Sequence, residues 1–187
     1  MMRRTGETLV EVEWRARGKG PARVETGIGF LDHMLESWAF HGGFGLRLKA
    51  EGDLRVDAHH TAEDVALALG EAMDEALGDR AGLHRFGWAY APLDEALARA
   101  VVDLVRRPHC ELALPPLPPM IGQLPSEMVP HLFRSLATAG RFTLHLDVLR
   151  AENGHHAVEA AFKALALAMA QALAVKGRSA RSTKGVL

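Results

Sequence analysis

The residues with the clearest chemical potential are histidines and glutamates in one fixed spacing. The motif His-His-x-x-Glu occurs twice, 96 residues apart, at His59, His60 and Glu63 and at His155, His156 and Glu159. Imidazole and carboxylate groups are ligands for ions such as Mn, Fe, Co and Zn. Residues three and four apart share one helix face, so one histidine and the glutamate can bind the same ion. The alternative, histidines that cap a helix or face solvent, does not explain the recurrence.

Two more histidines, His33 and His131, lie 98 residues apart at matching places in the two halves. A lone histidine is often a core residue, but the match favours a third ligand for each ion. Neighbouring residues of a helix point about 100° apart, so His59 and His60 cannot comfortably bind one ion together. The spacing therefore predicts two metals per chain, one held by His33, His60, Glu63 and His155 and the other by His59, His131, His156 and Glu159.

These motifs lie in an internal duplication, in which Glu7-x-Leu9 also returns as Glu95-x-Leu97. Alternating apolar residues predict strands over 10–14, 44–50, 98–104, 111–114 and 142–148, and a short one at 54–56. Apolar residues at helical spacing predict helices over 30–38, 65–77, 128–136 and 156–175. We expect an α+β fold: one domain, 1–187, of two similar halves, about 1–85 and 86–187, each a sheet with helices on one face.

Composition excludes several classes of protein. The chain has 187 residues, a net charge of −1 and 6% aromatic residues, unlike a basic nucleic-acid binder. The longest apolar run, 164–170, is far shorter than the roughly 20 residues of a membrane span. Cys110 is the only cysteine, which suits a reducing compartment, and the N-terminal residues lack the apolar region of a signal peptide. We expect a cytoplasmic protein that binds neither nucleic acid nor membrane.

Signals for phosphate binding are weaker. Arg85 and Arg107 flank predicted strands, and arginine suits bidentate contacts with phosphate. The C-terminal residues Ser182 and Lys184 add a hydroxyl and a cation. On spacing alone, solvated surface charge is the favoured interpretation of both arginines.

Five segments together resemble one known family: 29–34 (GFLDHM), 57–64 (DAHHTAED), 92–95 (PLDE), 155–163 (HHAVEAAFK) and 182–187 (STKGVL). From about residue 4 to residue 187 the chain resembles imidazoleglycerol-phosphate dehydratases. The resemblance implies a manganese-dependent lyase of histidine biosynthesis, which dehydrates imidazoleglycerol phosphate to imidazoleacetol phosphate. It also implies that each half is a four-stranded sheet with helices on one face, and that 24 subunits form a hollow shell.

The resemblance also implies residue roles. It makes the eight residues of the two predicted sets metal ligands, shared between neighbouring subunits, and it makes Glu7 the base. Substrate and phosphate contacts would come from His41, Arg85, Arg107, Lys163, Ser182 and Lys184. Two positions depart from the family pattern: Ser37 stands where glutamine is usual, and Ala151 where glycine is usual.

Two other functions suit the same residue types. A dinuclear metal phosphoesterase would use the ions, arginines and lysines equally well and would release inorganic phosphate. A non-catalytic metal-binding protein would need neither Glu7 nor Lys184.

Overall fold

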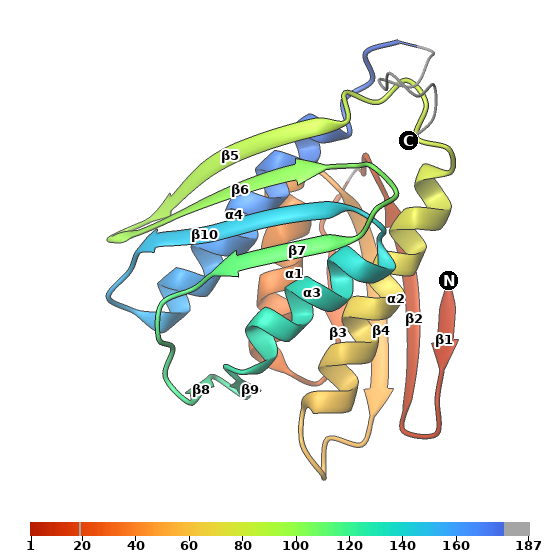
Figure 1. Ribbon diagram of the computed structural model, residues 1–187. Coiled ribbons are helices and arrows are strands. Elements are labelled where there is room, and N and C mark those ends of the chain that lie inside the picture. The colour runs from red at the N-terminus through yellow and green to blue at the C-terminus, as the bar shows by residue number, and fades with distance from the viewer. Residues whose placement is uncertain (19, 178–187) are drawn as a thin grey trace.

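Two four-stranded sheets enclose four helices in a computed structural model that describes residues 1–18 and 20–177 (Figure 1). The first sheet has the order β1-β2-β4-β3 and the second β5-β6-β10-β7. The first sheet contains β1 (Met2–Arg4), β2 (Thr8–Arg15), β3 (Arg23–Glu25) and β4 (Gly45–Gly52). The second contains β5 (Phe86–Leu93), β6 (Ala96–Asp103), β7 (His109–Ala113) and β10 (Thr143–Arg150). A small hairpin is formed by β8 (Met120–Ile121) and β9 (Leu124–Pro125).

The two sheets have the same topology. β4 pairs antiparallel with β2 and parallel with β3, and β10 pairs antiparallel with β6 and parallel with β7. Each sheet comes from one half of the chain, so the structure confirms the predicted duplication and α+β class.

The helices are α1 (Gly29–Gly42), α2 (His59–Leu77), α3 (Met128–Ala139) and α4 (Gly154–Ala172). α1 and α2 contact the first sheet, and α3 and α4 contact the second. Between these layers, α1 packs on α4 and α2 packs on α3. The helix interface therefore brings residues from the two halves together.

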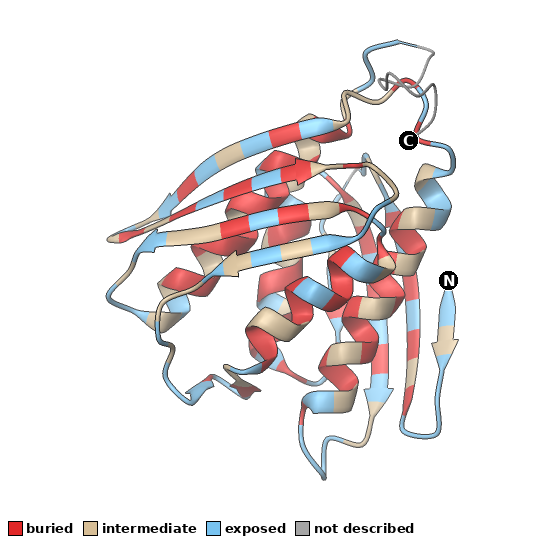
Figure 2. Cartoon of the chain, in the orientation of Figure 1, coloured by how far each residue is buried: buried red, intermediate tan, exposed pale blue. Residues whose placement is uncertain are grey.

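Periodicity explains the core, which Figure 2 shows as buried stripes on the inner faces. In β2, Val10, Val12 and Trp14 are buried while the residues between them are exposed. α4 buries mainly small residues, which let it lie close to β5. The contact is close enough that a Cβ added to Gly87 of β5 would lie 1.9 Å from the Ala168 carbonyl oxygen. Glycine is therefore required there.

Three sequence expectations differ from the structure. The predicted strand at 54–56 is a turn, because it joins β4 to α2 and has no partner strand. The edge strand β5 was not predicted, because it turns small residues such as Gly87 and Ala91 inward and exposes Phe86, Trp88 and Tyr90. β1 and β3, of 3 residues each, are too short to show a period.

A buried guanidinium ties the C-terminal ends of two helices together. The Arg80 side chain has no exposed surface. It donates to the carbonyl oxygens of Leu104, Gly140 and Arg141 at 3.0, 2.8 and 2.7 Å and to the Asp74 carboxylate at 2.6 Å. These contacts fix the end of α2 against the end of α3 and the loop after β6.

Among the described residues, no helix combines the length and apolar character that crossing a membrane requires.

Candidate metal centre

α2 begins at His59 and α4 begins one residue before His155, and the side chains of Asp57 and Asn153 accept backbone N–H groups at these helix starts. Asp57 Oδ1 accepts the His59 backbone N–H at 2.8 Å, ahead of α2. Asn153 Oδ1 accepts the backbone N–H groups of His155 and His156 at 2.8 and 3.4 Å, ahead of α4. The imidazoles are therefore not needed as caps, which argues against a purely structural role at the helix starts.

Two clusters of possible ligands lie between the helices. In the first, His33 Nε2 of α1 and His155 Nε2 of α4 lie 3.3 and 3.2 Å from the same oxygen, Glu159 Oε2. In the second, His131 Nε2 of α3 lies 3.0 Å from Glu63 Oε1, and His59 Nε2 lies 4.0 Å from Glu63 Oε2 of α2. We call these the α1/α4 cluster and the α2/α3 cluster. In each, the candidate ligand atoms are within 4.8 Å of one another.

Each cluster draws on both halves of the repeat, as the sequence predicted, but within one chain each carboxylate lies in the other cluster from the one the prediction gave it, so the predicted four-ligand sets, shared between neighbouring subunits, stay a prediction. Glu63 lies with His59 and His131, whereas the prediction placed it with His33, His60 and His155. Glu159 lies with His33 and His155 instead of with His59, His131 and His156. Both glutamates lie with the histidine four residues earlier, while the histidine three residues earlier faces a different carboxylate.

The α2/α3 cluster contains a polar atom that a metal would satisfy. His131 Nε2 is buried and has no hydrogen-bond partner among the described residues, although it faces Glu63 Oε1 at 3.0 Å. Buried polar atoms are rarely left without a partner, and an ion between imidazole and carboxylate would supply one. The residues present therefore fit a divalent ion bound by nitrogen and oxygen ligands.

The second histidine of each motif lies outside these clusters. His60 Nδ1 is 3.0 Å from Asp53 Oδ2, and His156 Nδ1 is 2.8 Å from Glu95 Oε2. These hydrogen bonds raise the pKa of both imidazoles. His60 and His156 thus remain outside the α1/α4 and α2/α3 clusters, and His156 forms a third group of possible ligands with Asp94 and Glu95.

Glu7 lies beside His60, with Oε2 3.7 Å from His60 Nδ1, and its side chain is 54% exposed. Its backbone is fixed: Thr5 Oγ1 accepts the N–H groups of Glu7 and Thr8 at 3.2 and 3.0 Å. Asp64 of α2 accepts hydrogen bonds from both threonine hydroxyls and from Arg3 Nε. The hairpin that carries Glu7 is therefore attached to the helix that carries His60.

Asp64 is the positioning residue that the sequence analysis missed, although it directly follows Glu63. Burial opposes its charged form, but the hydrogen bonds from Thr8, Arg3 and Thr5 and the charge of Arg3 outweigh burial and lower the pKa of Asp64. Its place in the HHxxED segment was the available signal.

Two of the expected substrate contacts lie near the α1/α4 cluster. Lys163 Nζ is 2.7 Å from Glu159 Oε1. Burial and the charge of Lys163 lower the pKa of His41, which α1 carries two turns after His33. Both side chains therefore lie within electrostatic reach of Glu159.

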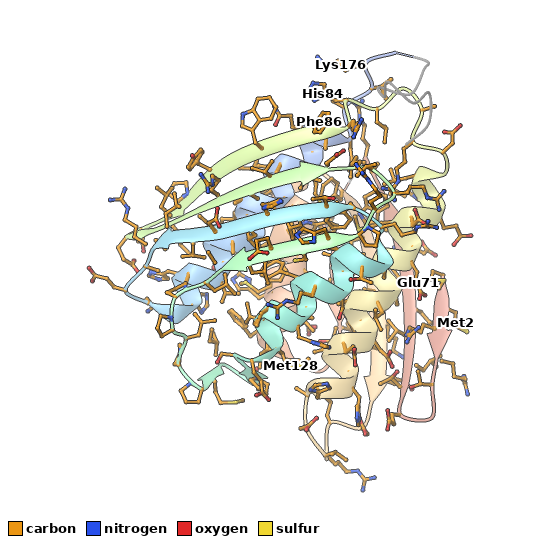
Figure 3. All side chains as sticks on the ribbon, in the orientation of Figure 1. Met2, Glu71, His84, Phe86, Met128 and Lys176 are labelled. Atoms are coloured by element: carbon orange, nitrogen blue, oxygen red, sulfur yellow. The ribbon has the colours of Figure 1, made fainter. Side chains whose placement is uncertain are left out.

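The two arginines lie elsewhere in the chain. The Arg85 backbone N–H donates to the carbonyl oxygen of Ala172, at the C-terminal end of α4. His155 is near the other end of this helix, about 25 Å away at a rise of about 1.5 Å per residue. Figure 3 shows His84 and Phe86, which flank Arg85, far from Met128 at the start of α3. Arg107 is exposed, and its backbone carbonyl oxygen accepts a hydrogen bond from the Thr143 hydroxyl. Thr143 begins β10, just after the C-terminal end of α3, whereas His131 lies near the N-terminal end of that helix. One chain therefore does not bring either arginine to a cluster, and Ser182 and Lys184 lie outside the described residues.

Comparison with known proteins places this geometry in one family. The family model described as "Imidazoleglycerol-phosphate dehydratase" matches residues 26–169. The protein of that name from Chloroflexus aurantiacus is 49% identical over 98% of this chain and 91% of its own length. The one from Phytophthora nicotianae is 53% identical over 98% of this chain, which spans only 41% of that longer protein. The solved structure of IGPD from Pyrococcus furiosus in complex with (S)-C348 aligns with this chain over 100% of both chains, with 37% identity and a TM-score of 0.85.

Proposed function

Because this chain belongs to the imidazoleglycerol-phosphate dehydratase family, we propose that it dehydrates imidazoleglycerol phosphate to imidazoleacetol phosphate in histidine biosynthesis. Family membership makes the protein a hydro-lyase, an enzyme that eliminates water by breaking a carbon–oxygen bond. This class of reaction separates it from the phosphoesterase and from the non-catalytic metal protein that suited the same residue types.

The observation that carries the proposal is the pair of clusters, each with two imidazole nitrogens around one carboxylate. We propose that they bind two Mn²⁺ ions per chain. The bound ions would supply positive charge that stabilises a negatively charged substrate imidazole and would orient the substrate hydroxyl groups. Three ligands per cluster leave room for substrate and for a further ligand.

Glu7 is the proposed base. The proton to be removed is on a carbon with no carbonyl neighbour, so the base must be held close to it. Glu7 is suited to this because the hairpin that carries it is attached to α2 while its side chain is 54% exposed. As the C–H proton passes to Glu7, the electron pair of that bond forms a carbon–carbon double bond and the C–O bond of the adjacent carbon breaks; the departing hydroxyl takes the proton from Glu7 and leaves as water, and the remaining enol rearranges to the ketone.

The remaining substrate contacts are proposed for His41, Lys163, Arg85, Arg107, Ser182 and Lys184. Lys163 places a cation next to the α1/α4 cluster, where it can attract an anionic substrate. The arginines are far from both clusters of their own chain, so they serve a site that a neighbouring copy completes.

The same reasoning applies to His60 and His156. We propose that they complete the metal sites of a neighbouring copy: His60 joins an α1/α4 cluster and His156 an α2/α3 cluster. Each ion would then have three imidazoles and one carboxylate, and the metal would connect subunits in a 24-subunit assembly. We place this assembly in the cytoplasm, where a chain with the single cysteine Cys110 stays reduced.

The test is to incubate the Mn²⁺-loaded protein with imidazoleglycerol phosphate and measure the enolisable ketone and inorganic phosphate. Ketone without phosphate release supports the proposal. Phosphate release would support the phosphoesterase instead, and metal retention with no product would support a binding protein.

A further inference from the structure

Two glutamates at equivalent places in the repeat have different surroundings. Glu7 directly precedes β2 and Glu95 directly precedes β6, and these strands hold the same position in their sheets. Each carboxylate lies beside the second histidine of a motif. The distance from Glu7 Oε2 to His60 Nδ1 is 3.7 Å, whereas that from Glu95 Oε2 to His156 Nδ1 is 2.8 Å. Only the second is a hydrogen bond.

Both oxygens of Glu95 are engaged. Oε1 accepts the backbone N–H groups of Glu152 and Asn153 at 3.2 and 2.9 Å, directly before α4. Glu95 is 29% exposed, about half the exposure of Glu7. These contacts fix Glu95 between the β5–β6 hairpin, which carries it, and the start of α4.

In the first half the carboxylate beside the second histidine comes from a different residue. Asp53, in the turn before α2, places Oδ2 3.0 Å from His60 Nδ1. Both histidines thus have a carboxylate on Nδ1, but Glu95 provides it in one half and Asp53 in the other. A carboxylate on one ring nitrogen selects the tautomer and leaves the other nitrogen as the metal ligand.

We infer that Glu95 is a positioning residue, which holds His156 with Nδ1–H toward the β5–β6 hairpin and Nε2 available to a metal. Its counterpart Glu7, relieved of this task by Asp53, is the carboxylate left free to act as base. The inference rests on the proposed function in taking His156 as a metal ligand.

The test measures Mn²⁺ affinity by competition with a chelator, without substrate. Glu95→Gln is expected to weaken the binding of one of the two ions by about 10- to 100-fold, a typical loss when the carboxylate behind a histidine ligand is removed. The matched control, Glu7→Gln, is expected to bind both ions with wild-type affinity. Unchanged affinity in Glu95→Gln, or an equal loss in Glu7→Gln, would overturn the inference. So would a third Mn²⁺ bound by the wild-type chain, because Asp94, Glu95 and His156 would then themselves form a metal site.

A double-mutant cycle separates positioning from a merely structural contact. If Glu95 acts through His156, adding Glu95→Gln to His156→Gln causes no further loss of Mn²⁺ affinity; an additive loss contradicts the inference.

The wild-type protein gives a measurement that needs no variant. In the metal-free chain at alkaline pH, ¹⁵N NMR of labelled histidine is expected to show His156 protonated on Nδ1, and protonation on Nε2 would refute the assignment. These measurements do not depend on turnover. The inference about Glu95 can therefore be refuted while the dehydratase assay supports the proposed function, and it can be supported while that assay fails.

Discussion

Substitution of Glu7 by glutamine separates the proposed chemistry from the fold. The change removes a proton acceptor and keeps the size of the side chain. General-base catalysis by a positioned side chain contributes about 10²- to 10⁴-fold, so kcat is expected to fall by that factor. This loss corresponds to about 2.7–5.4 kcal/mol in the activation free energy, at 1.36 kcal/mol per factor of ten.

The structure predicts that Glu7→Gln leaves the free energy of unfolding nearly unchanged. The Glu7 side chain is 54% exposed, and the hydrogen bonds of its turn are made by its backbone N–H and by Thr5, Thr8 and Asp64. Substitutions at such surface positions usually change the free energy of unfolding by no more than about 0.5 kcal/mol.

The assay compares three proteins for kcat, bound Mn²⁺ and urea unfolding. They are the wild type, Glu7→Gln and the control Glu13→Gln, whose side chain is exposed on β2 of the same sheet. Only Glu7→Gln should lose turnover, and all three should hold two ions. Near wild-type kcat in Glu7→Gln would show that another group takes the proton; loss of metal would show that Glu7 belongs to the ligand set.

Four further outcomes are expected. Arg80→Met should lower the free energy of unfolding by about 3–5 kcal/mol in urea, because it removes one partner of a buried ion pair, and no measurable loss would refute that account. The pKa of Asp64 is lower in the folded chain than in the unfolded one, so its stabilisation is complete above the ordinary aspartate range and is lost as the pH falls through the folded value. Asp64→Asn should therefore flatten the acid limb of the stability curve, which acid titration of unfolding would check. Chelation should release small oligomers, and added Mn²⁺ should restore the large one by size-exclusion chromatography; a large chelated species would contradict metal sites shared between subunits. Ser37→Gln should lower KM with little change in kcat, and a large fall in kcat would show a different role for this position.

Local patterns predicted much of this structure because local physics decides those features. The apolar spacing around Met34, Val65 and Leu132 marked helices that exist, and Gly43 ends α1 in the left-handed conformation, with a φ of 66°. The spacing between the repeats predicted that His33 would lie with a histidine of the other half, and it lies with His155. Motif spacing alone was enough to predict that each cluster draws on both halves.

Which carboxylate lies beside which histidines within one chain is information that spacing does not contain. Positions three and four residues apart both lie on one helix face, so Glu63 could have shared an ion with His60 or with His59. Within one chain Glu63 lies with His59, while the carboxylates of Asp53 and Glu95 are hydrogen-bonded to His60 and His156 outside the two clusters. Glu95 reaches His156 from a hairpin 61 residues away in sequence, which only the folded sheet brings close. In the same way, Arg85 and Arg107 match the family pattern but lie at the far end of the helices.

Divergence after duplication also makes the two clusters chemically unequal. Lys163 follows Glu159 by one helical turn and pairs with it at 2.7 Å, whereas the position one turn after Glu63 is Leu67. His41 follows His33 by eight residues, and the corresponding position after His131 is Ala139. Near its ligands, the α1/α4 cluster therefore has a cation and a titratable ring where the α2/α3 cluster has apolar side chains. If both clusters bind metal as proposed, an anionic substrate would be attracted to the first cluster more than to the second, and two similar sites would bind one asymmetric molecule in a single orientation.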